Sequence, residues 1–247
     1  MSAPSVTARV FALLGAFDER HRTLRLSELA TRAGLPLSTA HRLVAELTGC
    51  GALRRLPSGR YAVGRRMWDL GLLAPVQTDL REVASPFLHD LYGATLETVH
   101  LAVRDGLEVL YVDRLAGHRS VPIISTTGSR LPMHGTGVGK VLLAHAPADV
   151  RRAVLDAGLR RFTPYTVTSA RVLEEQLDRV RADGYATTAE EMTLGACSVA
   201  VPITSGPDVV ASVGFVVPDL RRTRGRLVAA LRVAAQGIAR SLPSARG

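Results

Sequence analysis

A glycine turn at residue 34, placed between two short amphipathic segments, constrains the fold of this chain more than any other feature. Gly34 suits the left-handed conformation that ends a helix, and Pro36 prevents that helix from continuing. The segment before the turn is expected to form a helix that is capped by Ser27 and ends at Ala33. A further helix is expected from about Ser38, with four apolar residues on one face: Ala40, Leu43, Val44 and Leu47. Two helices joined by such a turn are typical of a helix-turn-helix.

The segments on either side extend this motif. Before it, apolar residues recur at helical spacing at Val6, Val10, Leu13, Leu14 and Phe17. After it, two strand-like runs over 52–56 and 60–63 flank the turn sequence Pro57-Ser58-Gly59, which predicts a short hairpin. The order helix, helix, turn, helix, hairpin predicts a winged helix-turn-helix domain over residues 1–64. A linker helix is expected over residues 65–78.

The basic residues are concentrated in this first part of the chain. Residues 1–66 contain 11 arginines and four acidic residues, so they carry +7 of the net charge of +9. Arginine accounts for 30 of the 31 basic residues, which indicates a GC-rich coding bias, but such a bias does not explain why acidic residues are scarce at one end. A small basic module of this kind is typical of a surface that binds nucleic-acid phosphates.

Seven residues of this module are candidates for contact with double-stranded DNA. On the third helix, the short side chains of Ser38 and Thr39 would let the backbone approach the major groove. His41 and Arg42 on the same exposed face could reach base edges. Three arginines of the hairpin could contact phosphates or the minor groove: Arg54, Arg55 and Arg60. The alternative is a small helical bundle in which Arg42 merely faces water.

Residues 79–247 alternate between helical and strand-like patterns, which predicts an α+β domain with a mainly antiparallel sheet. The sequence Asp105-Gly106 predicts a hairpin between strands over 98–103 and 108–114. The other expected strands are 121–125, 197–203 and 208–217. The expected helices are 79–92, 141–144, a segment capped by Ser169 and ended by Gly184, and 223–242.

The glycine-rich sequence Gly135-Thr136-Gly137-Val138-Gly139-Lys140 fits neither of the common phosphate-binding motifs. A Walker A loop needs a glycine at residue 134 and a serine or threonine after the lysine, and both are missing here. The dinucleotide fingerprint needs a different glycine spacing. Two interpretations stay open: a helix N-terminus whose free N–H groups bind an anionic small molecule, or a tight helix start with glycines required for packing.

Other chemistries have little support in the sequence. Cys197 beside Ser198 lacks the surroundings of a nucleophile, so no catalytic residue is expected. The histidines are scattered, so neither a metal site nor a cofactor is expected. The pair Glu190-Glu191 is either solvated or borders a pocket. Distant cysteines, no membrane-spanning apolar run and no export signal favour a cytoplasmic protein without a membrane partner.

A series of longer motifs follows in order from about residue 5 to residue 242. These motifs are 35–43 (LPLSTAHRL), 59–61 (GRY), 64–70, 131–134 (LPMH), 139–144 (GKVLLA), 184–186 (GYA), 190–191 (EE) and 195–202 (GACSVAVP). Together they resemble the isocitrate-lyase-regulator (IclR) family of bacterial transcriptional regulators. The resemblance implies a winged helix-turn-helix that is joined by a linker helix to a GAF-like effector-binding domain. It also implies dimers, often paired into tetramers on DNA, and a small organic effector.

The resemblance also implies where the effector binds. The corresponding pocket residues are Leu131, Met133, Gly137, Val138, Thr188, Ala196, Ser198, Gly214 and Val216. Family members that bind small keto acids carry an acidic residue at the position of Thr188 and hydroxyl side chains at those of Gly214 and Val216. Because these polar groups are missing here, we expect a larger and more apolar anion, an aromatic or branched carboxylate.

The expected function is that of a ligand-responsive transcriptional regulator, not an enzyme, and a repressor of a catabolic operon. A homodimer would read a pseudo-palindromic operator whose half-sites lie about 34 Å apart or a multiple of that. Two alternatives remain. One is a small-molecule-binding enzyme with an incidental basic N-terminal module, and the other is a sensor that binds a ligand and a protein but not DNA.

Overall fold

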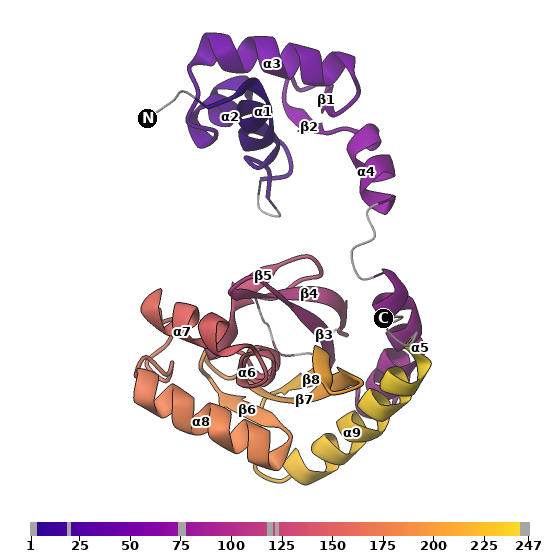
Figure 1. Cartoon of the computed structure of the whole chain (residues 1–247). Helices are drawn as coiled ribbons and strands as arrows, with labels where there is room; N and C mark the ends of the chain where they lie inside the picture. Colours follow the sequence, from indigo (N-terminus) through magenta and orange to yellow (C-terminus); the bar gives the residue numbers. More distant parts are fainter. Residues whose placement is uncertain (1–3, 19–20, 74–77, 118–120, 122–123, 243–247) are drawn as a thin grey trace. The chain divides into compact units, whose positions relative to one another are not determined.

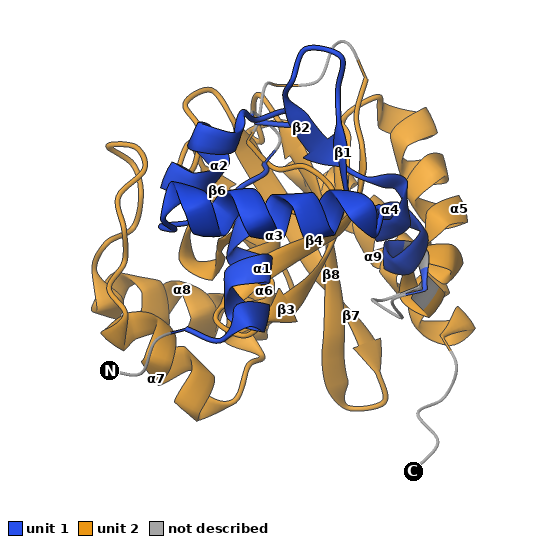
Figure 2. Ribbon diagram, turned by 90° about the horizontal axis from the view of Figure 1, so that it is seen from above, with its two compact units in different colours: residues 1–76 blue, residues 77–247 orange. Residues whose placement is uncertain are grey.

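The computed structural model describes residues 4–18, 21–73, 78–117, 121 and 124–242. The chain divides into two compact units, residues 1–76 (unit 1) and residues 77–247 (unit 2), which Figure 2 colours separately. Each unit has a hydrophobic core of its own, as expected of a domain.

Unit 1 is a winged helix-turn-helix, as the sequence predicts. Its elements are α1 (Val6–Leu14), α2 (Leu26–Arg32), α3 (Leu37–Gly49), β1 (Leu53–Arg55), β2 (Tyr61–Val63) and α4 (Arg65–Leu72). Gly34 adopts the left-handed conformation, with a φ of 64°, and the predicted apolar face of α3 is buried. The two strands pair antiparallel, with Arg54 opposite Ala62.

Two local predictions for unit 1 are wrong. Ser27 does not cap α2, because the helix already begins at Leu26 and the residue before it, Arg25, is the N-cap. The Glu28 carboxylate accepts the backbone N–H of Arg25 at 2.7 Å, which satisfies a donor that the helix itself leaves free. In α1, Leu13 is fully buried but Val6 is exposed, because Val6 lies in the first turn beyond the edge of the core.

Unit 2 is built on a six-stranded sheet with the order β5-β4-β3-β8-β7-β6, in which all neighbours are antiparallel. The strands are β3 (Thr98–Asp105), β4 (Glu108–Leu115), β5 (Arg130–Pro132), β6 (Ala186–Ala189), β7 (Cys197–Ser205) and β8 (Asp208–Val217). The helices are α5 (Thr78–Thr95), α6 (Gly137–Ala144), α7 (Ala148–Asp156), α8 (Ala170–Asp183) and α9 (Arg224–Ser241). The α+β fold class is therefore as predicted.

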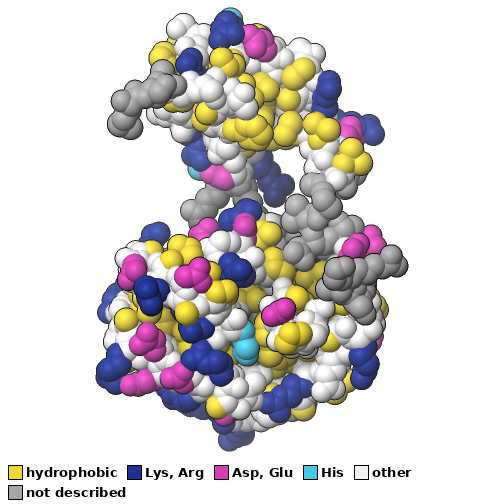
Figure 3. Space-filling view, viewed as in Figure 1, with side chains coloured by type: hydrophobic (Ala, Val, Ile, Leu, Met, Phe, Trp, Pro, Cys, Tyr) yellow, Lys and Arg dark blue, Asp and Glu magenta, His cyan; other side chains and the backbone are white. Residues whose placement is uncertain are grey.

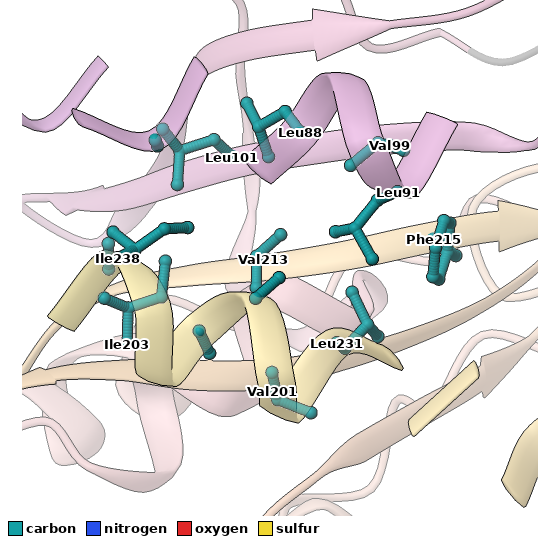
Figure 4. Packing of buried hydrophobic residues seen from close by; sticks show 14 of the residues in the cluster. Leu88, Leu91, Val99, Leu101, Val201, Ile203, Val213, Phe215, Leu231 and Ile238 are labelled. Carbon is teal, nitrogen blue, oxygen red and sulfur yellow. The ribbon is translucent and has the colours of Figure 1, made fainter. Parts of the chain in front are cut away.

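The two faces of the sheet are covered by different helices (Figure 1). On the first face, α5 and α9 pack side by side, and side chains such as Leu88 and Leu231 meet those of the central strands (Figure 4). On the second face, α6, α7 and α8 form another core. Since side chains alternate along a strand, β7 supplies Val199 and Val201 to the first face and Ser198 and Ala200 to the second.

The strand predicted at 121–125 is not formed by the residues described there. Val121, Ile124 and Ser125 lie outside any strand, and residues 122–123 lie outside the described part of the chain. The sheet edge is formed instead by β5, of which Leu131 pairs with Val109. Neither β6 nor α7 was expected from the sequence, and α6 begins four residues before the predicted Val141.

Candidate functional site

The four candidate DNA contacts of α3 lie together in its first half. Ser38, His41 and Arg42 are exposed, whereas Thr39 is half-buried because it lies one turn before the core residue Leu43 on the same side of the helix. The Arg42 guanidinium donates to the Glu46 carboxylate at 2.8 Å, and both side chains are more than half exposed. An exposed pair of this spacing is worth only about 0.5 kcal/mol, so Arg42 can leave it at little cost.

The three hairpin arginines differ from one another. Arg54 and Arg55 are both exposed, but they point to opposite sides of β1 because side chains alternate, and Arg55 lies 5.9 Å from the centre of the Tyr61 ring. Arg60 donates to the Thr23 carbonyl oxygen at 2.8 Å and to the Glu28 carboxylate at 2.9 Å. Arg60 therefore ties the hairpin to α2 in this structure, whereas Arg54 and Arg55 are more open to phosphates.

Unit 2 contains a pocket between the second face of the sheet and the N-terminus of α6. The small residues Ala200 and Gly214 leave about 500 Å³ of empty space there, part of it open to solvent. Eight of the nine residues expected from the family resemblance line this pocket: Leu131, Gly137, Val138, Thr188, Ala196, Ser198, Gly214 and Val216. The ninth, Met133, does not line it, because its side chain is fully buried in the core beside α6.

The N-terminus of α6 forms one polar end of the pocket. Ser198 Oγ accepts the N–H of Gly137 at 3.1 Å and shares a hydrogen bond of 2.6 Å with Thr188 Oγ1. Gly137 has to be a glycine, since a Cβ there would lie 2.6 Å from Ser198 Oγ. Within the described part of the chain, the N–H of Val138 has no hydrogen-bond partner, so this donor remains for a ligand. The two interpretations of the glycine-rich sequence, close packing and anion binding, are thus compatible with each other.

A second polar group in the pocket was not predicted from the sequence. His100, Tyr111 and Ser125 also line it, and His100 Nε2 lies 3.0 Å from Ser125 Oγ. The His100 ring packs edge-on against Tyr111, with the ring centres 4.8 Å apart. Burial and, to a smaller extent, the charge of Arg114 together lower the pKa of His100 to about 3, so this imidazole is neutral at physiological pH.

The buried histidine predicts a pH dependence of stability. Between its ordinary pKa of 6.5 and a folded pKa of about 3, only the unfolded chain binds the proton, so the free energy of unfolding falls as the pH falls. The slope contributed by His100 is about 1.4 kcal/mol per pH unit. His100→Asn lacks this titrating group. We therefore expect the free energy of unfolding of the wild-type chain, relative to that of His100→Asn, to fall by this amount for each pH unit of acidification. Denaturant titrations at several pH values check this, and parallel curves would contradict a neutral His100.

A buried ion pair supports the loop 190–196 that forms one wall of the pocket. Lys140 Nζ lies 2.5 Å from Glu191 Oε1 and donates to the Gln176 side chain at 2.7 Å. The Lys140 and Glu191 side chains are only 1% and 7% exposed. Burial raises the pKa of Glu191 and lowers that of Lys140, and each charge opposes the shift of the other. Thr166 donates to the Glu191 carbonyl oxygen at 2.6 Å, which fixes the loop further.

The pocket does not carry the marks of a catalytic centre. Burial raises the pKa of the Cys197 thiol, which disfavours the reactive thiolate. The His134 ring shares a hydrogen bond of 3.0 Å with the Arg160 carbonyl oxygen and does not line the pocket. In the described part of the chain, no three histidine, cysteine or acidic side chains gather at a possible metal site. No helix described here is long and apolar enough to cross a membrane.

Comparison with known proteins identifies the family. Residues 6–57 match the IclR helix-turn-helix domain, and residues 74–240 match the C-terminal domain of the bacterial transcriptional regulator IclR. The chain belongs to the IclR family. Regulators of this family bind DNA and small-molecule effectors, so this chain is a transcriptional regulator with a ligand-binding C-terminal domain and not an enzyme.

Individual relatives support this assignment over most of the chain. The regulator XynR of Escherichia coli is 32% identical over 79% of this chain and 78% of its own length. The repressor AllR of Klebsiella pneumoniae is 31% identical over 89% of this chain and 82% of its own. An IclR homologue from Microbacterium hydrocarbonoxydans, solved in complex with 4-hydroxybenzoate, has a TM-score of 0.91 and 36% identity over 96% of this chain and 99% of its own.

Proposed function

We propose that this IclR-family protein represses a catabolic operon and is released from its operator by an aromatic carboxylate. The pocket of unit 2 is the observation on which this proposal depends. Its walls combine apolar residues such as Leu131, Val138 and Val216 with the N-terminus of α6 at one end. A helix N-terminus favours a carboxylate, and the apolar walls favour a ring. The 4-hydroxybenzoate bound by the Microbacterium homologue belongs to the same chemical class.

The DNA-binding part of the proposal rests on unit 1. In this proposal Ser38, Thr39, His41 and Arg42 contact the major groove, while Arg54 and Arg55 contact phosphates; the exposure of Ser38, His41, Arg42, Arg54 and Arg55 supports it. A homodimer presents two such units to a pseudo-palindromic operator. The helix α4 exposes the apolar side chains of Trp68 and Leu70, which suit a second copy, and Figure 3 shows hydrophobic side chains on the surface of unit 1. Such an apolar patch is typical of a contact surface.

The direct test is footprinting of the region upstream of the neighbouring operon, with and without a ligand panel. We expect protection of a pseudo-palindrome that benzoate or 4-hydroxybenzoate weakens, whereas glyoxylate and pyruvate do not. Release by the short keto acids alone would contradict the proposed effector class. Stronger protection in the presence of an aromatic carboxylate would contradict repression with release.

Substitution of Arg42 separates base reading from phosphate binding. Arg42→Ala is expected to weaken operator binding by about 1–3 kcal/mol and to relax the preference for one base pair, because a bidentate arginine contact discriminates against the wrong base. Arg54→Ala is the matched control, since a phosphate contact weakens binding to all sequences and reduces the salt dependence. Binding assays against the operator and a scrambled duplex measure both effects. Equal losses on both duplexes for Arg42→Ala would exclude a role in base reading.

A further inference from the structure

The two polar groups of the pocket lie at opposite ends. His100 on β3 pairs with Gly214 on β8, and Gly214 pairs with Ala200 on β7. Ser198 lies two residues along β7 from Ala200, on the same face. With strands about 4.8 Å apart and a rise of about 3.3 Å per residue, the Cα atoms of His100 and Ser198 are roughly 12 Å apart. The pocket is therefore longer than a short keto acid and polar at both ends.

We propose that the His100–Ser125 pair recognises a hydroxyl group of the effector, at the end of its ring opposite the carboxylate. This inference rests on the proposed aromatic carboxylate. The pair and the N-terminus of α6 both line the pocket, and β8 lies between the strands that carry His100 and Ser198. A ligand that meets both needs polar groups at its two ends, as in a benzene ring with a carboxylate and a hydroxyl group para to it.

The hydrogen-bonding inventory of the pair favours a hydroxyl. Both side chains are more than nine-tenths buried, so a polar atom that faces the pocket needs a partner from the ligand. If Ser125 donates to His100, the serine oxygen can still accept; if His100 donates, the serine O–H can still donate. A hydroxyl group satisfies either arrangement because it both donates and accepts.

A charged group fits this end less well. None of the residues that line the pocket is a lysine or arginine, and His100 is buried in its neutral form. Arg114 lies beside His100 on β4 but does not line the pocket. A second carboxylate could only accept hydrogen bonds, and it would find no lysine or arginine among the lining residues to contact directly, which makes its burial costly. The pair therefore selects hydroxyaromatic monocarboxylates over dicarboxylates and over rings without a hydroxyl group.

The test is isothermal titration of the full chain with benzoate, 4-methylbenzoate and 4-hydroxybenzoate. We expect the wild-type chain to bind 4-hydroxybenzoate at least about tenfold more tightly than the other two, because a site built for a hydroxyl is left unsatisfied by an analogue that lacks it. Ser125→Ala should lose most of this preference, because its affinity for 4-hydroxybenzoate falls much more than its affinity for benzoate. A matched control is Ser212→Ala, which removes a buried hydroxyl that donates to the Val201 carbonyl oxygen at 2.9 Å outside the pocket; it should keep the preference.

Three outcomes overturn parts of this picture, and they are distinguishable. Equal affinity of the wild-type chain for benzoate and 4-hydroxybenzoate overturns hydroxyl recognition and leaves the aromatic effector standing. A preference that survives in Ser125→Ala, or that is lost equally in Ser212→Ala, overturns the assignment to the His100–Ser125 pair. Absence of binding for all three ligands overturns the proposed effector class itself.

Discussion

Glu191→Ala is expected to lower the free energy of unfolding of unit 2 by about 3–5 kcal/mol, because it leaves the Lys140 ammonium buried without a counter-charge. Among the residues that the structure describes, the Gln176 side chain alone would remain as a polar partner of Lys140, and a neutral amide oxygen does not replace a carboxylate. Chemical denaturation followed by circular dichroism measures the loss. Hydrogen exchange of the amides of unit 2 assigns it to this unit.

The exposed pair Arg171–Glu175 on α8 provides the matched control. Both side chains are more than half exposed, so Glu175→Ala should change the stability by less than about 1 kcal/mol. A loss in Glu191→Ala no larger than in Glu175→Ala would contradict a structural role of the buried pair. Replacement of both partners, Lys140→Met with Glu191→Leu, should recover part of the loss, because no unpaired charge then remains.

Gly137→Ala is expected to abolish the response to effector while operator binding is retained. The added Cβ would lie 2.6 Å from Ser198 Oγ and 3.4 Å from Ser198 Cβ, so it would displace the group that holds the start of α6 and would fill the polar end of the pocket. Overpacking of this kind costs about 1–3 kcal/mol, and a cost of this size at the binding site corresponds to about a fivefold to 150-fold loss of effector affinity.

Gel-shift titrations of the operator with increasing benzoate measure this effect. Gly225→Ala in α9 is the control, since nothing lies within 4 Å of the added Cβ there and alanine favours a helix over glycine by up to about 1 kcal/mol. We expect that variant to release DNA normally. Normal release by Gly137→Ala would show that the start of α6 does not contact the effector.

The sequence is informative where structure depends on neighbouring residues. The turn at Gly34, the buried face of α3 and the hairpin around Gly106 follow from periodicity and turn chemistry. In contrast, residues 121–125 have the apolar composition of a strand but form none where they are described. The short strand β6 has only four residues, too few for a clear alternating pattern.

The functional residues that were missed depend on contacts between distant parts of the chain. The sequence gives no sign that Arg60 is paired, because Thr23 and Glu28, its hydrogen-bond partners, lie beside it only in the folded chain. The pairing of Lys140 with Glu191 joins residues 51 positions apart. His100 and Ser125 meet only because the sheet order places β3 and the segment before β5 at the same pocket. A sequence signal existed for the ion pair alone, because the chain has a single lysine, Lys140, and an acidic doublet at Glu190-Glu191.

Side chains that alternate along β7 and β8 have two different roles. Val201, Val213 and Phe215 maintain the packing under α5 and α9, while Ser198 and Val216 meet whatever molecule occupies the opposite side. Substitutions at every second position can therefore change which effector binds without lowering the stability of the packed core. Directed evolution of a biosensor from this protein should confine its libraries to those alternate positions and leave their neighbours fixed.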